Sequence, residues 1–372
     1  MKFTIGKNLL LENLSNVVKA ISTKNIIPIL NGVKFELNEE GLFLTASDSE
    51  LTIRAFIEKK EITNVEKEGS IIIQSKYILD IIRKMPSDLI NFELMDGLKI
   101  KIYSDNSQYD LNCLDPKEYP SLKLEEVEKP VVVDGNTFKT IISQTAFAIS
   151  TQELRPLLTG LNFKIVGDVL ECIATDSYRL AKKIINLDEN STFNVTIPAK
   201  TLNEIGKILE TESNITLSIS SKKIIFNLKN TKISTRLISG VYPDTSKIIP
   251  TSFLYSLDSS SQSIVNAIDR ASLLSPEKSN FVKMSLSEDS FIISSKSLEI
   301  GSVVERIKNF IYTGDRLDIS FTARYVIDAI RAIGSEEVSI LLNGDMKTFI
   351  IKNKNDEKRY NDLCKNRVLA EE

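Results

Sequence analysis

A chain of 372 residues suits two or three domains of ordinary size, each large enough to bury a core of its own. Its composition, 42% hydrophobic and 26% charged residues, is ordinary for a soluble protein, and a net charge of −3 gives no overall sign of a nucleic-acid partner. Histidine is absent, which excludes Ser-His-Asp and Cys-His catalytic sites and histidine-ligated metals.

Other absences narrow the choice further. The three cysteines (Cys113, Cys172 and Cys364) are scattered without a C-x-x-C pair, so we expect a reducing compartment and neither a disulfide framework nor a zinc site. No phosphate-binding loop and no dinucleotide fingerprint occurs, and we expect neither a cofactor nor a metal. An enzyme built from carboxylates or lysines remains open at this point, although these absences argue against one. Without a signal peptide or a membrane-spanning stretch, a cytoplasmic protein that does not contact membranes is expected.

The chain opens with a short alternating strand that includes Phe3 and Ile5. A helix is then expected from about Lys7 to Ile21, followed by several strands, a second helix and further strands. The apolar face of the first helix carries Leu10, Leu14, Val17 and Ile21. In later strands Ile215, Leu217 and Ile219 alternate with polar residues, as do Ile224, Phe226 and Leu228.

This plan occurs three times. The second helix begins at Ser75, Ala199 and Ala323, in steps of 124 residues. Its expected apolar face carries Ile78, Ile81 and Met85 in the first copy, Leu202, Ile205 and Leu209 in the second, and Val326, Ala329 and Ile333 in the third. The third copy resembles the other two less at its start, where D-S-S-S-Q-S-I-V-N-A-I-D-R-A-S takes the place of the opening helix.

Two further blocks return 128 residues later in the second copy. P-I-L-N-G-V-K-F from Pro28 matches P-L-L-T-G-L-N-F from Pro156, and A-S-D-S from Ala46 matches A-T-D-S from Ala174. Tyr-Pro at 119–120 also recurs at 242–243. Agreement over separated blocks predicts an α+β fold of three repeated domains, at 1–127, 128–251 and 252–372. Boundaries are expected in the charged run before Val131 and near Thr251.

The same three positions of the second helix are charged in every copy, in the order base, acid, base. They are Lys76, Asp80 and Arg83; Lys200, Glu204 and Lys207; and Arg324, Asp328 and Arg331. One interpretation is a ladder of ion pairs along each helix, which contributes a few tenths of a kcal/mol per pair. The other is a repeated basic face that binds a polyanion through its phosphates without reading bases.

These blocks closely resemble the bacterial sliding clamp family, the beta subunit of DNA polymerase III. The resemblance rests on M-K-F-T-I, I-I-P-I-L-N-G, L-D-P-K-E-Y-P-S-L, R-P-L-L-T-G-L-N-F, A-T-D-S-Y-R-L-A and G-V-Y-P-D-T. It extends from Met1 to about Lys354, and the ordered set is specific although any one block is weak.

The resemblance implies three clamp domains, each with two helices backed by antiparallel sheets, in a head-to-tail homodimeric ring. Such a ring is not an enzyme: it encircles duplex DNA without sequence preference and tethers the polymerase for processive DNA replication. The implied partners are the replicative polymerase alpha subunit, the clamp loader delta subunit, and other polymerases and repair proteins that carry a short peptide motif.

Carried over residue by residue, the DNA-binding set is the six bases of the second helices together with two loop residues. The set is Lys24, Lys76, Arg83, Gln152, Lys200, Lys207, Arg324 and Arg331. For Lys24, an ordinary solvated loop lysine is an equally good interpretation.

The family's partner pocket, between its second and third domains, implies a second set of residues. The set is Leu158, Thr175, Ser177, Tyr178, Arg179, Leu180, Pro243, Lys247 and Ile248. Apolar walls suit the anchors of a mostly apolar peptide, and Thr175 and Arg179 can satisfy its backbone. Leu158, Leu180 and Ile248 could instead be core residues.

The implied dimer contact involves Tyr109 and Leu111 of the first domain and Leu273 and Leu274 of the third, although leucines at that place are more often core. The end of the chain departs from the family. Its last residues, D-E-K-R-Y-N-D-L-C-K-N-R-V-L-A-E-E, replace an apolar strand and a P-x-R-type tail. A frame change in the coding sequence or a diverged paralogue would give such an end, which puts the last strand and one side of the pocket in doubt.

Two alternatives to a clamp are considered. Asp48 and Asp176 of the A-[ST]-D-S blocks could be the carboxylates of a metal-dependent enzyme, but the third copy has Lys296 at this position, and capping of a turn explains the aspartates better. The unusual end suggests the other alternative, a diverged adaptor that binds partners without encircling DNA.

Overall fold

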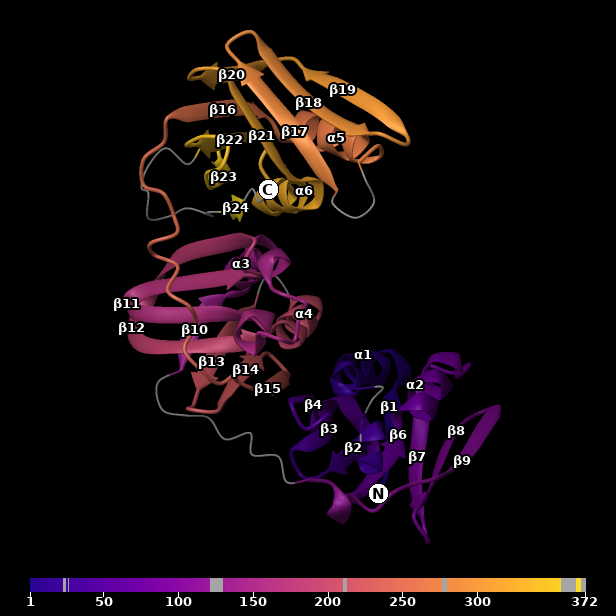
Figure 1. The fold of residues 1–372 in the computed structure, drawn as a ribbon. Helices are drawn as coiled ribbons and strands as arrows, with labels where there is room; N and C mark the ends of the chain where they lie inside the picture. The colour runs from indigo at the N-terminus through magenta and orange to yellow at the C-terminus, as the bar shows by residue number, and fades with distance from the viewer. Residues whose placement is uncertain are drawn as a thin grey trace. The chain divides into compact units, whose positions relative to one another are not determined.

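The computed structural model describes residues 1–22, 25, 27–120, 130–209, 213–275 and 280–355, together with the backbone of 366–368. These residues form two compact units, Met1–Asn136 with Asn203–Leu237, and Thr137–Leu202 with Ile238–Glu372. In each copy of the repeat, two helices accompany antiparallel strands (Figure 1), which confirms the predicted α+β class.

The first copy forms β1 (Lys2–Gly6), α1 (Lys7–Val17), β2 (Gly32–Leu37), β3 (Gly41–Ser47), β4 (Leu51–Glu58), β5 (Ile62–Lys67), β6 (Gly69–Gln74), α2 (Ser75–Lys84), β7 (Leu89–Met95), β8 (Lys99–Ser104) and β9 (Ser107–Asn112). The second forms β10 (Val131–Asp134), α3 (Gly135–Thr145), β11 (Gly160–Thr175), β12 (Arg179–Pro198), α4 (Ala199–Ile208), β13 (Asn214–Ile219), β14 (Lys223–Leu228) and β15 (Thr231–Arg236). The third forms β16 (Tyr255–Ser260), α5 (Ser261–Ser272), β17 (Phe281–Ser287), β18 (Ser290–Ser297), β19 (Gly301–Ile307), β20 (Phe310–Thr313), β21 (Leu317–Thr322), α6 (Ala323–Ile333), β22 (Glu337–Leu342), β23 (Phe349–Asn353) and β24 (Asn366–Val368).

The first unit contains two antiparallel sheets, with strand orders β5-β1-β7-β8-β9 and β10-β13-β14-β15-β4-β3-β2-β6. The larger sheet joins two copies of the repeat, because β15 pairs with β4 and places Ile233 opposite Ile53. Strands β13–β15 of the second copy therefore belong to the first unit. The compact units consequently cut across the second copy, and residues 123–129, where one domain boundary is expected, lie outside the described residues.

The second unit also contains two antiparallel sheets, with orders β11-β12-β24-β23-β22-β16-β20 and β19-β18-β17-β21. Here too the sheet joins two copies, because β24 pairs with β12 on one side and with β23 on the other. The unusual end of the chain thus still supplies a short final strand. This strand, β24, is the last strand whose presence the sequence left in doubt.

The helices lie on the sheets by their predicted apolar faces, with two differences. Helix α1 buries Leu10, Leu14 and Val17, but it ends at Val17 and continues as a 3-10 turn, so Ile21 falls beyond it and is only half-buried. In α2 the buried face includes Ile82, while Ile81 is half-buried. The predicted apolar residues of the second helices in the other two copies are all buried.

Large side chains fill the space beneath these faces. Phe3 and Phe92 stack with ring centroids 4.9 Å apart in the first unit, and Phe138 and Phe163 meet at 6.0 Å in the second. Burial of such rings removes the largest apolar areas from water, so each unit has a core of its own. No helix in the described part of the chain has the length and apolarity needed to cross a bilayer.

Candidate functional site

The A-T-D-S block forms the tight turn between β11 and β12. The Asp176 Oδ1 atom accepts hydrogen bonds from the backbone N–H groups of Tyr178 (3.0 Å) and Arg179 (2.9 Å), and Ser177 has a left-handed φ of 83°. Asp48 caps the matching turn in the first copy through the N–H groups of Glu50 and Leu51. The turn-capping interpretation of both aspartates is confirmed.

A metal-dependent site at these aspartates has no support from the geometry. Among the residues that the structure describes, no group of three or more Asp, Glu, Cys or His could hold a metal ion. Both oxygens of Asp176 also have partners already, because Oδ2 accepts a hydrogen bond from Nε of Arg179 at 3.1 Å.

A cavity of about 650 Å³ lies beside the A-T-D-S turn and is mostly apolar. Seven of the nine predicted pocket residues line it: Leu158, Thr175, Ser177, Arg179, Leu180, Pro243 and Ile248. Tyr178 and Lys247 are exposed and are not among its lining residues. The structure thus brings most of the predicted set together, whereas its role in binding a peptide stays a prediction.

The cavity also has walls that the sequence analysis missed: Arg155, Pro156, Leu157, Ser239 and Thr245. The first three precede Leu158 in the R-P-L-L-T-G-L-N-F block of the family resemblance, which was a usable signal for them, and the internal repeat also covers Pro156 and Leu157. Thr245 ends the G-V-Y-P-D-T block, which was a usable signal for it, whereas nothing in the sequence pattern singles out Ser239.

Leu158, Leu180 and Ile248 could each belong to the core or to the cavity wall, and the structure gives different answers for them. Leu158 and Leu180 are 5% and 3% exposed and pack with Ile173 and Tyr242, so they belong to a small core and line the cavity as well. Ile248 is 41% exposed and is therefore a wall residue rather than core.

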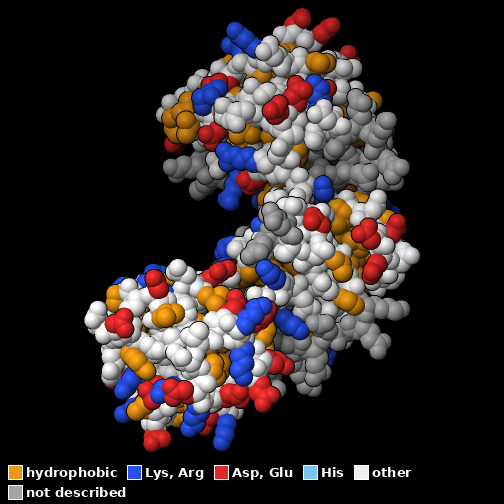
Figure 2. All heavy atoms as spheres, turned by 180° about the vertical axis from the view of Figure 1, so that it is seen from behind, with side chains coloured by type: hydrophobic (Ala, Val, Ile, Leu, Met, Phe, Trp, Pro, Cys, Tyr) orange, Lys and Arg blue, Asp and Glu red, His pale blue; other side chains and the backbone are white. Residues whose placement is uncertain are grey.

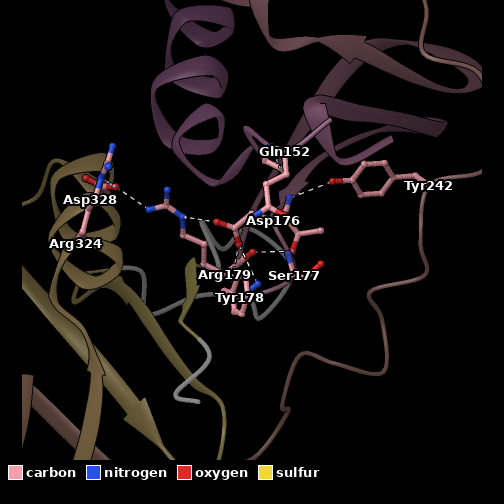
Figure 3. A network of polar contacts seen from close by, with 10 residues as sticks. Gln152, Asp176, Ser177, Tyr178, Arg179, Tyr242, Arg324 and Asp328 are labelled. Carbon is pink, nitrogen blue, oxygen red and sulfur yellow. Dashed lines mark hydrogen bonds and ion pairs between the residues drawn. The ribbon is translucent and has the colours of Figure 1, made fainter. Parts of the chain in front are cut away.

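Arg179 links the cavity to the third copy of the repeat (Figure 3). Its Nη1 atom donates to Oδ2 of Asp328 on α6 at 2.7 Å, and its guanidinium lies 4.6 Å from the ring centroid of Tyr325 and 5.3 Å from that of Phe147. The Arg179 side chain is 9% exposed. A buried, charge-assisted and stacked arginine of this kind fixes the relative position of the groups that hold it.

Tyr242 supports the same turn from the opposite side. Its hydroxyl accepts a hydrogen bond from the backbone N–H of Thr175 at 3.1 Å, and burial raises the pKa of this hydroxyl well above its ordinary value. The hydroxyl therefore remains protonated at any physiological pH. Gln152, predicted to approach DNA, is an exposed loop residue whose backbone N–H donates to Oγ of Ser150.

All six predicted bases of the second helices are exposed: Lys76, Arg83, Lys200, Lys207, Arg324 and Arg331. Part of the predicted ladder of ion pairs is present in each helix, since Asp80 binds Arg83 at 3.1 Å, Glu204 binds Lys207 at 3.0 Å and Asp328 lies 3.7 Å from Arg324. The basic side chain of each pair is more than half exposed, and pairs at this spacing on a helix surface contribute only about 0.3–0.5 kcal/mol, so phosphates can compete for these bases. Lys24 lies outside the described residues.

One face of the molecule carries charges of both signs. On the face drawn in Figure 2, Lys and Arg side chains are interspersed with Asp and Glu. This agrees with a net charge of −3 and restricts any basic face to particular elements, such as the second helices.

The predicted dimer residues are accessible on the two units. Tyr109 (37% exposed) and the half-buried Leu111 lie on β9, which is the edge strand of its sheet among the described residues. Leu273 follows α5 and is 77% exposed, and Leu274 is half-buried. The alternative that Leu273 is a core residue is therefore wrong.

Comparison with known proteins gives a consistent result. Three family models match the chain: the N-terminal domain of the DNA polymerase III beta subunit at residues 1–123, its central domain at 132–244 and its C-terminal domain at 246–365. The beta sliding clamp of Bacillus subtilis is 39% identical over 366 residues, which is 96% of this chain and 97% of that protein. The chain belongs to the DNA polymerase III beta subunit family, the beta sliding clamps.

Other members agree with this assignment. The beta sliding clamp of Staphylococcus aureus is 37% identical, over 96% of this chain and 97% of its own length. The crystal structure of the Bacillus subtilis clamp superposes with a TM-score of 0.95 at 37% identity, over 100% of this chain and 99% of that chain. The Streptococcus pyogenes beta subunit gives 0.94 at 29% identity, over 100% and 99%. The family is a class of processivity factors rather than enzymes, and membership favours the clamp over the adaptor.

Asp328 of the third copy binds the buried Arg179, whereas the equivalent Asp80 of the first copy has only an exposed partner, and this difference is measurable. Asp328→Asn removes the charge opposite the buried Arg179 and should lower the free energy of unfolding by about 1–3 kcal/mol. Asp80→Asn breaks only an exposed pair and should cost less than about 0.5 kcal/mol. Denaturant unfolding of the two variants tests this, and equal losses would contradict the buried role of Asp328.

Proposed function

We propose that two copies of this chain close head to tail into a ring around duplex DNA and tether the replicative polymerase during DNA replication in the cytoplasm. Each of the two chains contributes three clamp domains, at 1–127, 128–251 and 252–372. The observation that carries this proposal is the repetition of two exposed bases on one amphipathic helix in all three domains. Gln152 and Lys24 are assigned to the same DNA contact.

The charge pattern explains how such a ring would slide. Each pair of bases shares its helix face with one acid, so attraction to phosphates is partly offset. Contacts to phosphates carry no sequence information and exchange with counterions. The DNA would thus be kept by closure of the ring rather than by tight binding, and no sequence preference is expected.

We further assign the 650 Å³ cavity to the short, mostly apolar peptide of partner proteins. The partners would be the polymerase alpha subunit, the clamp loader delta subunit, and other polymerases and repair proteins. Leu158, Leu180 and Ile248 offer apolar contacts for anchor side chains, and Thr175 and Arg179 offer polar groups at one side. This composition, apolar with a few polar groups, is what peptide anchors require.

The bases of the second helices can be tested with a charge-matched control. Reversal of all six (Lys76, Arg83, Lys200, Lys207, Arg324 and Arg331 to Glu) should shorten retention on closed circular DNA, and the loss should change with salt. Reversal of six exposed bases away from these helices (Lys59, Lys60, Lys222, Lys229, Arg316 and Lys347 to Glu) should change retention much less. Gel filtration of loaded circles measures both, and equal retention by the two variants would refute the assignment.

The partner pocket can be tested at its exposed wall. Ile248→Asp should weaken binding of the purified polymerase alpha subunit at least about tenfold, because a carboxylate would have to lose its water against apolar anchors. Val241→Asp is the control, since Val241 is 85% exposed nearby in the chain and does not line the cavity. Surface plasmon resonance measures the affinities, and a wild-type affinity for Ile248→Asp would exclude this pocket.

The dimer contact rests on Leu273, an exposed apolar residue with no other evident role. Leu273→Asp should convert a dimer of about twice 41.7 kDa into monomers, because it places a carboxylate in an apolar interface. Leu298→Asp, at a residue that is 97% exposed in the same copy, should leave the dimer intact. Light scattering gives the masses, and a stable dimer of the Leu273 variant would remove this residue from the interface.

A further inference from the structure

A second cavity, of about 270 Å³, lies in the first unit at positions that the repeat relates to the walls of the larger one. Leu30, Ser47 and Ser49 line it, and a shift of 128 residues takes them to Leu158, Thr175 and Ser177 of the larger cavity. Pro120 corresponds to Pro243 through the repeated Tyr-Pro pair, at a different spacing of 123 residues. The chain thus builds a related cavity twice.

The backbone beneath the two cavities follows the same course. Ser49 has a φ of 78°, against 83° for Ser177, and Asp48 Oδ1 accepts the Leu51 N–H at 2.7 Å as Asp176 Oδ1 accepts the Arg179 N–H at 2.9 Å. Short 3-10 helices at Pro28–Asn31 and Pro156–Thr159 supply the leucine wall in each case. The two cavities are therefore related in the backbone geometry of their turns as well as in amino-acid sequence.

The apolar support is also repeated. Leu30 packs in a small buried cluster with Ile29, Ile72 and Tyr119, and Leu158 packs in the equivalent cluster with Tyr242. Tyr119 and Tyr242 are each 7% exposed, so both rings are buried to the same extent, and this burial raises the pKa of both hydroxyls. A rigid apolar support is what keeps a cavity open.

The smaller cavity differs from the larger one in its chemistry. Thr52 occupies the position of Leu180, and its hydroxyl pairs with that of Ser47 at 2.8 Å, which gives this cavity a polar wall. Leu51, which is 1% exposed, occupies the position of Arg179. This turn therefore has no arginine equivalent to the one that binds Asp328 on α6.

Charged residues from the second copy complete the smaller cavity. Lys223 and Arg236 line it together with Glu50, which lies 3.5 Å from Arg236. Both side chains of that pair are more than 60% exposed, and such a pair is weak enough for a ligand carboxylate to replace Glu50. The lining therefore carries two positive charges and one negative charge beside an apolar wall of Ile27, Leu30 and Pro120.

We propose that this cavity is a second docking site, which binds a short acidic peptide segment through one apolar side chain and a neighbouring carboxylate. The apolar side chain packs on Leu30 and Pro120, and the carboxylate binds Arg236 and Lys223. Its volume is less than half that of the larger cavity, so one anchor enters rather than several. The proposal depends on the first unit alone and holds whether or not the larger cavity binds partner peptides.

The probe is the fluorescein-labelled peptide Gly-Leu-Asp-Asp-amide, with Gly-Leu-Asn-Asn-amide as the matched peptide that lacks carboxylates. Fluorescence anisotropy with the full chain should give a dissociation constant for the acidic peptide at least fivefold lower than for the amide peptide. Lys223→Glu with Arg236→Glu should abolish this preference. Lys222→Glu with Lys229→Glu, an equal charge change at exposed residues that do not line the cavity, should preserve it.

Ile248→Asp separates the two cavities, because it alters only the larger one and should leave the preference for the acidic peptide unchanged. A preference that survives in the Lys223/Arg236 variant, or that disappears in the Ile248 variant, would overturn the proposal. No binding of the acidic peptide at millimolar protein would overturn it as well. Failure of the partner-pocket assignment would instead appear in the polymerase-binding measurement and leave these results untouched.

Discussion

Burial of one apolar helix face against antiparallel sheets is the interaction on which the rest of this structure depends. It is made in each copy of the repeat, by residues such as Ile78, Leu202 and Val326 that are at most 1% exposed. Because the inward face of each second helix is fixed by this burial, the opposite face is free to carry charge. The three pairs of exposed bases are thus a consequence of how each domain buries its core.

The copies of the repeat do not form three separate bodies, because sheets continue from one copy into the next. Strand β15 extends the sheet of the first copy, and β24 joins strands of the second copy to strands of the third. Shared sheets make each junction continuous, and a cavity lies beside the A-[ST]-D-S turn in each unit. One junction has an arginine bound to α6 and a large apolar cavity, whereas the other has a leucine and a smaller, more polar one.

Much of this could be predicted from the sequence, and the misses have physical causes. Repetition revealed the domains and the helices, because buried apolar residues recur at fixed spacing. The end of α1 at Val17 was missed because Ile21 continues the apolar pattern while the backbone tightens into a 3-10 turn. Seven pocket residues were found through the family resemblance, but Tyr178, which lies between two of them in the sequence, does not line the cavity.

The partner of Arg179 could not be predicted. Asp328 lies 149 residues away, and its position in the helix pattern suggested only a local pair with Arg324 or Arg331. Only the fold brings the two side chains together. Leu273 shows the reverse case, in which a residue of a type usually buried is exposed, and nothing in its local sequence indicates this.

The central claim is that the chain retains DNA by closure around it, and topology tests this most directly. The chain should be loaded on nicked circular DNA and followed by gel filtration before and after a single restriction cut. We predict that it elutes with the intact circles and is released once the DNA is linear, because it can then slide off the ends. Equal retention on circular and linear DNA, or none on either, would contradict the account.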